Sequence, residues 1–129
     1  MTTALIIGGG PGISASCARL FSREGMSVCI AARNPDKEVL LQLSEEFGVK
    51  RYACDAQDPQ SVAALFAQVV TEVGVPKLVV HNIDGRSADI FRKTITEADP
   101  DLVLDVMKNS AYSAFLVGQQ AARYRPSFS

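Results

Sequence analysis

The chain has 129 residues, enough for one domain with a core, and its hydrophobic fraction of 47% and charged fraction of 21% are ordinary for a globular protein. Its formal net charge of −1 argues against a general binder of the nucleic-acid backbone, which would carry a basic face. The first apolar run is too short for a secretion signal or a membrane span, and the three cysteines lack metal-ligand spacing. We therefore expect a cytoplasmic protein with no metal, nucleic-acid or membrane partner.

Short apolar runs alternate with segments of helical periodicity along the chain. Strands are expected at residues 4–7, 28–31, 52–54 and 78–81. Helices are expected between them, and a further, long helix is expected from about 100 to 124. Asp58 and Asp99 each precede a proline, which is the pattern of an N-cap followed by proline at the first helical position.

The strands are apolar on both faces, which is typical of a parallel sheet covered by helices on both sides. We therefore predict one α/β domain over residues 1–129, with a Rossmann-like, doubly wound parallel sheet of four strands. The longest irregular segment spans 82–99, where a functional loop is expected.

Gly8, Gly10 and Gly12 follow the first strand and open the first helix. Side-chain-free residues before a helix N-terminus let a phosphate group approach unpaired backbone N–H groups and the positive end of the helix dipole. A Walker loop is excluded because no Gly-Lys-Ser/Thr follows. Two alternatives stay open: a glycine-rich turn without a ligand, and a flavodoxin-like or receiver-like domain, which the glycine loop and the lack of paired acids after the first strand disfavour.

The stretch Gly8-Gly9-Gly10-Pro11-Gly12-Ile13-Ser14 resembles the TGxxxGxG loop of the short-chain dehydrogenase/reductase family. Ile7 replaces the threonine of that motif, and Ser14 replaces its last glycine. The resemblance implies the strand order 3-2-1-4 and a nicotinamide dinucleotide whose pyrophosphate lies over the loop. Gly8, Gly10, Gly12 and Ile13 are then cofactor-binding residues.

The end of the second strand carries Arg33 and Asn34, at the position where the family distinguishes its cofactors. An acid there suits the ribose 2′-hydroxyl of NAD, whereas a basic residue suits the 2′-phosphate of NADP. Arg33 therefore favours NADP(H), with NAD still possible; the alternative is a solvated arginine in a turn.

Further family matches follow the third and fourth strands. The resemblance implies that Asp55 and Ala56 contact the adenine, although Asp55 is also open to helix capping, a task for which Asp58 is better placed. Asn82 and Gly85 match the family's NNAG stretch, which lines the ribose and braces the sheet. His81, the single histidine, is interpreted as a strand-end residue satisfied by backbone and not as a catalytic base.

The family's catalytic pair, Tyr-x-x-x-Lys, is missing from these 129 residues. Four positions after the three tyrosines stand Ala56, Leu116 and Phe128. The helix carrying the family's proton-relay asparagine aligns with Ser110 at that position, and Asn109 stands one residue earlier. One residue turns a side chain by about 100° on a helix, so the relay position stays open between the two.

The chain thus resembles the N-terminal, cofactor-binding portion of the family, C-terminally truncated. We expect it to bind NADP(H) without catalysing hydride transfer alone. The fourth strand should form an exposed apolar edge, and a homo-oligomer could form through the 100–124 helix, whose residues Leu102, Val106, Phe115 and Val117 are expected at the surface. The alternative is a non-catalytic dinucleotide-binding or interaction module that acts through a partner. No residue identifies a substrate.

Overall fold

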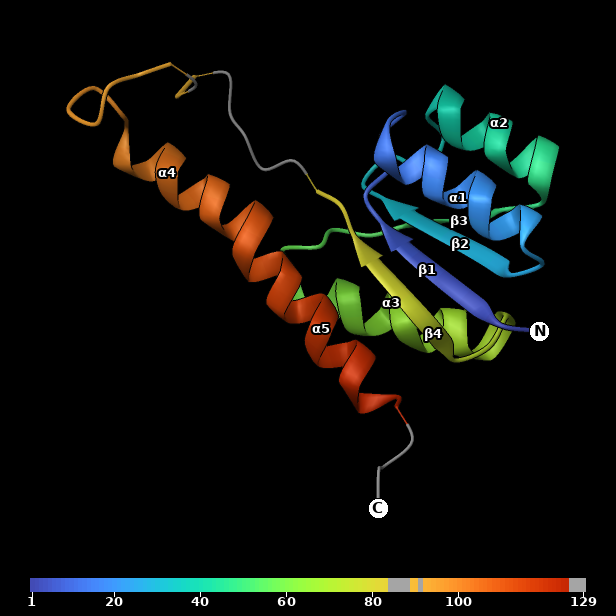
Figure 1. Cartoon of the computed structure of the whole chain (residues 1–129). Helices are drawn as coiled ribbons and strands as arrows, with labels where there is room; N and C mark the ends of the chain where they lie inside the picture. Colours follow the sequence, from blue (N-terminus) through green and yellow to red (C-terminus); the bar gives the residue numbers. More distant parts are fainter. Residues whose placement is uncertain (84–88, 91, 126–129) are drawn as a thin grey trace.

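In the computed structural model, which describes residues 1–83, 89–90 and 92–125, four parallel strands form one sheet (Figure 1). Its spatial order is β3-β2-β1-β4, as predicted. The strands are β1 (Thr3–Ile7), β2 (Ser27–Ala32), β3 (Lys50–Ala53) and β4 (Pro76–His81). Each begins one or two residues earlier than the sequence predicts, and β3 ends at Ala53.

Helices cover both faces of this sheet (Figure 1). On one face lie α1 (Ile13–Arg23) and α2 (Glu38–Phe47), and on the other lie α3 (Pro59–Glu72) and α5 (Ser113–Arg123). Helix α4 (Pro100–Met107) precedes α5 and extends beyond the carboxyl ends of the strands, where none of its residues is buried. The doubly wound architecture is therefore confirmed.

The alternation of side chains along β1 explains why helices pack on both faces. Leu5 and Ile7 lie in the core cluster that contains Phe66 of α3, whereas Ile6 lies in the cluster that contains Leu40 of α2. Successive residues of a strand point to opposite faces, so a strand that is apolar at every position needs cover on both sides.

Polar side chains cap the starts of α3 and α4, and a glycine ends α2, as predicted. The Asp58 side chain accepts a hydrogen bond from the Gln60 N–H at 3.0 Å, and Asp99 accepts one from the Asp101 N–H at 2.9 Å. Gly48 ends α2 in the left-handed conformation, with φ of 70°. These contacts satisfy backbone groups that have no partner within the helices.

The long helix differs from the prediction in two ways. A π-helical turn at Lys108–Tyr112 (labelled η1) joins α4 to α5. Of the four apolar residues expected at its surface, only Phe115 is exposed, because Val117 is buried against the core and Leu102 and Val106 are half-buried. Within the described part of the chain, no helix has the length and apolar character needed to cross a membrane.

The predicted apolar edge is present. Strand β4 pairs with β1 alone among the described strands, and Leu78 on it is 37% exposed. An unpaired edge strand presents free backbone groups that can pair with another strand.

Candidate functional site

A cavity of about 350 Å³ opens where the strands β1, β2 and β4 reach their carboxyl ends. Open α/β sheets bind their ligands at this edge, and the volume falls in the range of small-molecule sites. The cavity is lined by five of the residues predicted to bind a cofactor, namely Gly8, Gly10, Arg33, Ala56 and Asn82.

The first two glycines of the loop are required by the packing of the protein itself. Gly8 has a φ of +116°, and a Cβ on it would overlap the carbonyl oxygen of Asn82. A Cβ on Gly9 would lie 2.9 Å from Cβ of Ala32 and 3.0 Å from a methyl group of Leu40. Gly10 lines the cavity and differs from both, because a Cβ there would meet nothing within 4 Å. The space at Gly10 is therefore free for a ligand.

The first helix begins beside this loop without a polar cap. Gly12 is the N-cap of α1, no side chain caps the helix, and its first turn holds no acidic residue. Such a helix start can bind an anion through its free N–H groups. Ile13 is 65% exposed and does not line the cavity.

Ser14, which stands in place of the last glycine of the family motif, is fully buried. The Asn82 side-chain amide donates a hydrogen bond to its hydroxyl at 3.0 Å. Asn82 thus holds the start of α1 through its side chain on Ser14, and its carbonyl oxygen occupies the space that a Cβ on Gly8 would need. The place of Asn82 beside a cofactor's ribose stays a prediction.

The end of β2 carries an ion pair that the sequence did not predict. Nη2 of Arg33 lies 3.6 Å from Oδ1 of Asp55, and the same carboxylate oxygen accepts a hydrogen bond from the Gln57 N–H at 3.1 Å. Asp58 rather than Asp55 caps α3, as expected from the sequence, and the contact of Asp55 with an adenine stays a prediction. Asp55 lines a neighbouring depression, together with Arg33 and Ser61, rather than the cavity itself.

Asn34, another predicted residue, lies in a local turn. Asn34 does not line the cavity, because its side-chain oxygen accepts a hydrogen bond from the Asp36 N–H at 3.1 Å within a local turn. Gly85 lies outside the described residues.

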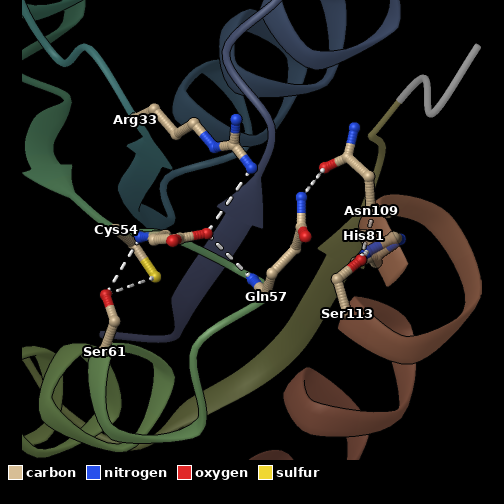
Figure 2. A network of polar contacts seen from close by, with 8 residues as sticks. Arg33, Cys54, Gln57, Ser61, His81, Asn109 and Ser113 are labelled. Carbon is tan, nitrogen blue, oxygen red and sulfur yellow. Dashed lines mark hydrogen bonds and ion pairs between the residues drawn. The ribbon is translucent and has the colours of Figure 1, made fainter. Parts of the chain in front are cut away.

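Asn109 lines the cavity. Its side chain points toward Gln57 (Figure 2). Its side-chain oxygen accepts a hydrogen bond from the Gln57 side-chain amide at 3.3 Å. Ser110 instead donates to the carbonyl oxygen of Val106 at 2.6 Å and does not line the cavity. The π-helical turn contains an extra residue compared with an α-helical turn. Asn109 lies in this turn and lines the cavity.

His81 bonds to a side chain as well as to the backbone, and only the backbone contact was expected from the sequence. Its Nε2 lies 2.9 Å from Oγ of the buried Ser113, which also lies 2.6 Å from the carbonyl oxygen of Asn109 (Figure 2). A hydroxyl has one proton, so when Ser113 donates to that carbonyl it accepts from Nε2–H of His81. This pair links the end of β4 to the π-helical turn that carries Asn109.

Burial lowers the pKa of His81 below its usual value, which gives a testable pH dependence. The unfolded chain then binds a proton more readily than the folded one, so the free energy of unfolding should fall as the pH drops from about 7 to about 5.5. Urea unfolding at both pH values measures this change. A His81→Gln variant should lose less stability over this interval, and an equal loss in the variant would contradict the assignment to His81.

Seven residues that line the cavity were not predicted as site residues from the sequence: Ile7, Gly9, Ala31, Ala32, Lys37, Cys54 and Ile83. The run of three glycines was a usable signal for Gly9, whereas nothing local distinguishes Lys37 from other exposed lysines. Burial raises the pKa of the Cys54 thiol, which favours an unreactive wall residue. Among the described residues, no group of three or more His, Cys, Asp or Glu side chains could hold a metal ion.

The sheet order and the glycine-lined cavity at its carboxyl edge define a Rossmann-like α/β protein. A family model described as enoyl-(acyl carrier protein) reductase matches residues 8–127, and the chain belongs to this family, within the short-chain dehydrogenases/reductases.

Named relatives agree with this assignment. The chain is 28% identical to an uncharacterized oxidoreductase of Caenorhabditis elegans, over 95% of this chain and 41% of that protein. It is 29% identical to the short-chain reductase protein NovJ of Streptomyces niveus, over 95% of this chain and 48% of that protein.

Solved structures agree with the fold. A variant of actinorhodin polyketide ketoreductase with NADPH has a TM-score of 0.84 and 28% identity, over 95% of this chain and 46% of that one. A mutant short-chain dehydrogenase/reductase of Serratia marcescens has a TM-score of 0.83 at 20% identity, over 95% and 50%. The chain therefore spans about half the length of the proteins that it matches.

Proposed function

We propose that this chain is the NADP(H)-binding part of an oxidoreductase and that it binds the cofactor without catalysing hydride transfer alone. The observation that carries the proposal is the cavity at the carboxyl edge of the sheet, which adjoins an uncapped helix start and is lined by Arg33 and Lys37.

The residues at this edge fit a dinucleotide phosphate. The open space over Gly10 and the free N–H groups at the start of α1 suit a pyrophosphate, and the two cations suit a 2′-phosphate. The similar actinorhodin ketoreductase was solved with NADPH, which supports the same choice of cofactor. When bound, the nicotinamide ring would donate or accept a hydride.

Asn109 is our candidate for the relay position, in preference to Ser110. Its side chain lines the cavity, whereas the Ser110 hydroxyl is engaged by the helix backbone. The Tyr-x-x-x-Lys pair that would complete proton transfer is missing from the 129 residues. We therefore expect binding without turnover in this chain.

Calorimetric titration of the purified chain with NADP⁺ and with NAD⁺ tests the proposal. We expect tighter binding of NADP⁺ and no reductase turnover in the same sample. An Arg33→Ala variant should lose about tenfold or more of its NADP⁺ affinity, because a charge-assisted contact contributes about 1.5–3 kcal/mol. Failure of the wild-type chain to bind either dinucleotide would overturn the proposal.

A surface feature favours the second candidate, an interaction module that acts through a partner. Five large apolar side chains on α4, η1 and α5 are between 41% and 58% exposed: Val103, Leu104, Met107, Tyr112 and Phe115. Exposed apolar clusters of this kind mark contact surfaces, including contacts between copies of one chain. A chain that binds no dinucleotide but sediments as a defined oligomer would favour this candidate.

A further inference from the structure

A second hollow lies between α3 and α5, which cover the same face of the sheet (Figure 1). Its volume of about 290 Å³ is near the lower end of the range of small-molecule sites. Of the described residues, none lines both this hollow, here called the α3–α5 groove, and the cavity at the carboxyl edge. The groove combines aliphatic side chains with polar ones, among them Ala63, Leu116, Gln60, Gln119, Gln120 and Arg123.

Gln120 carries a buried side-chain amide that has no partner. The residue is 8% exposed, yet no group in the described part of the chain forms a hydrogen bond with this amide. Among the described residues, no side-chain oxygen or nitrogen that is sealed from solvent lacks a partner, so the unpartnered amide reaches the surface of the groove. Buried polar groups are normally hydrogen-bonded. The amide of Gln120 therefore offers both a donor and an acceptor to a ligand in the groove.

The position of Gln120 on α5 makes this burial unusual. Leu116 and Val117, which precede it by four and three residues, are buried against the core. Residues at these spacings share one face of a helix, and the core-facing positions of a helix are normally apolar. Gln120 thus places an amide where an apolar side chain would pack without an unpaired polar group.

Arg123 gives the groove a positive charge. Among the described residues, it is the only charged one that lines the groove, and no acidic group there forms an ion pair with its guanidinium. It follows Gln120 by three residues, so the two side chains are neighbours on the surface of α5. A guanidinium pairs well with the two oxygens of a carboxylate. The groove therefore presents a cation next to a free amide.

We propose that the α3–α5 groove binds the C-terminal residue of a peptide. The terminal carboxylate pairs with the guanidinium of Arg123. The adjoining peptide group pairs with the amide of Gln120, whose N–H and C=O match the C=O and N–H of a peptide. A small aliphatic side chain on the bound residue packs against Ala63 and Leu116. This site is independent of the proposed cofactor site.

Two further amides favour a peptide over a small acid of the same chemistry. An N-acylated amino acid also carries one carboxylate and one amide, but it has no second peptide group. The side chains of Gln60 and Gln119 are exposed, line the groove and have no hydrogen-bond partner within the described ranges. They are thus available to the peptide group that precedes the terminal one.

The test titrates the purified chain with three probes, followed through the NMR signal of the Gln120 side-chain amide. The probes are acetyl-Ala-Ala-Leu with a free carboxylate, the same peptide with a C-terminal amide, and N-acetyl-leucine. We expect the free-carboxylate peptide to shift the signal and to bind about tenfold more tightly than its amide form, because only the carboxylate pairs with a charge. N-acetyl-leucine should bind at least about threefold more weakly than the peptide.

Arg123→Gln and its matched control, Arg23→Gln, test the charge. Arg23 is also exposed and also stands in the last turn of its helix, but α1 covers the opposite face of the sheet. Arg123→Gln should lower the affinity for the free-carboxylate peptide about tenfold, whereas Arg23→Gln should leave it unchanged.

Gln120→Leu tests the amide with two readouts. The affinity for the peptide should fall about tenfold, because the terminal peptide group loses its partner. The melting temperature should rise by about 3 °C, because the variant removes an unpaired buried amide and continues the apolar face of α5. A residue that served only the packing of α5 would not lower the affinity for the peptide when replaced.

The outcomes separate this inference from the proposed function. If no probe shifts the Gln120 signal, or if either Gln120→Leu or Arg123→Gln keeps the full affinity for the peptide, the groove is not a peptide site. Equal binding of N-acetyl-leucine and the peptide would also overturn the assignment to a peptide. A chain that binds NADP⁺ but none of the probes would overturn this inference alone, and one that binds the peptide but no dinucleotide would overturn the proposed function alone.

Discussion

Replacing Gly8 with alanine is expected to destabilise the chain by more than about 3 kcal/mol, a large share of the 5–15 kcal/mol typical of a folded domain. The left-handed φ of +116° is strained for any residue with a Cβ, at a cost of about 1–3 kcal/mol. The added methyl group also overlaps the backbone carbonyl of Asn82, which cannot move away easily because its N–H donates to the Ile7 carbonyl at 2.8 Å. Urea unfolding followed by circular dichroism measures the loss.

Gly10→Ala is the matched control for this prediction, and its expected effect is on binding instead of folding. A Cβ at Gly10 meets no protein atom within 4 Å, and the residue does not need the left-handed conformation. The melting temperature should therefore stay within about 2 °C of the wild type. The NADP⁺ affinity should fall about tenfold or more, because the methyl group occupies the space proposed for the pyrophosphate. Equal stability of the Gly8 and Gly10 variants would contradict this division of roles.

The fold was predictable because its signals are local and repeated. Several local signals each mark where one strand or helix begins or ends. They are the apolar runs of β1 and β2, the Asp-Pro pairs before α3 and α4, and the glycine at the end of α2. These signals agree with one another, which is what lets a sequence specify one architecture.

The details of the site were less predictable, because they depend on contacts between segments far apart in sequence. Arg33 and Asp55 are paired across the ends of β2 and β3, and His81 meets Ser113 from another element. The π-helical turn has no clear local signature, and within it Asn109 lines the cavity whereas Ser110 does not. Composition and periodicity give the elements, whereas such pairings follow only from how the elements pack.

Replacing Phe66 with alanine is expected to cost about 3–5 kcal/mol, because the ring is fully buried and its removal leaves a cavity in the core. Phe66 lies on α3 and stacks on Tyr124 at the end of α5, with ring centroids 6.2 Å apart and an angle of 12° between the planes. This ring thus joins the last helix to the sheet. A helix of this length is marginal alone and depends on its packing.

Phe115→Ala removes the same atoms from a ring that is 58% exposed, and it should change the free energy of unfolding by no more than about 0.5 kcal/mol. Hydrogen exchange gives a second readout, because Phe66→Ala should weaken the protection of α5 more than that of β1. A uniform loss of protection would show instead that α5 unfolds only together with the sheet. In either case, the loss in the free energy of unfolding should be larger for the buried ring than for the exposed one. A Phe115 variant that is as destabilised as the Phe66 variant would contradict the packing described above. It would indicate that Phe115 is covered in solution by another copy of the chain.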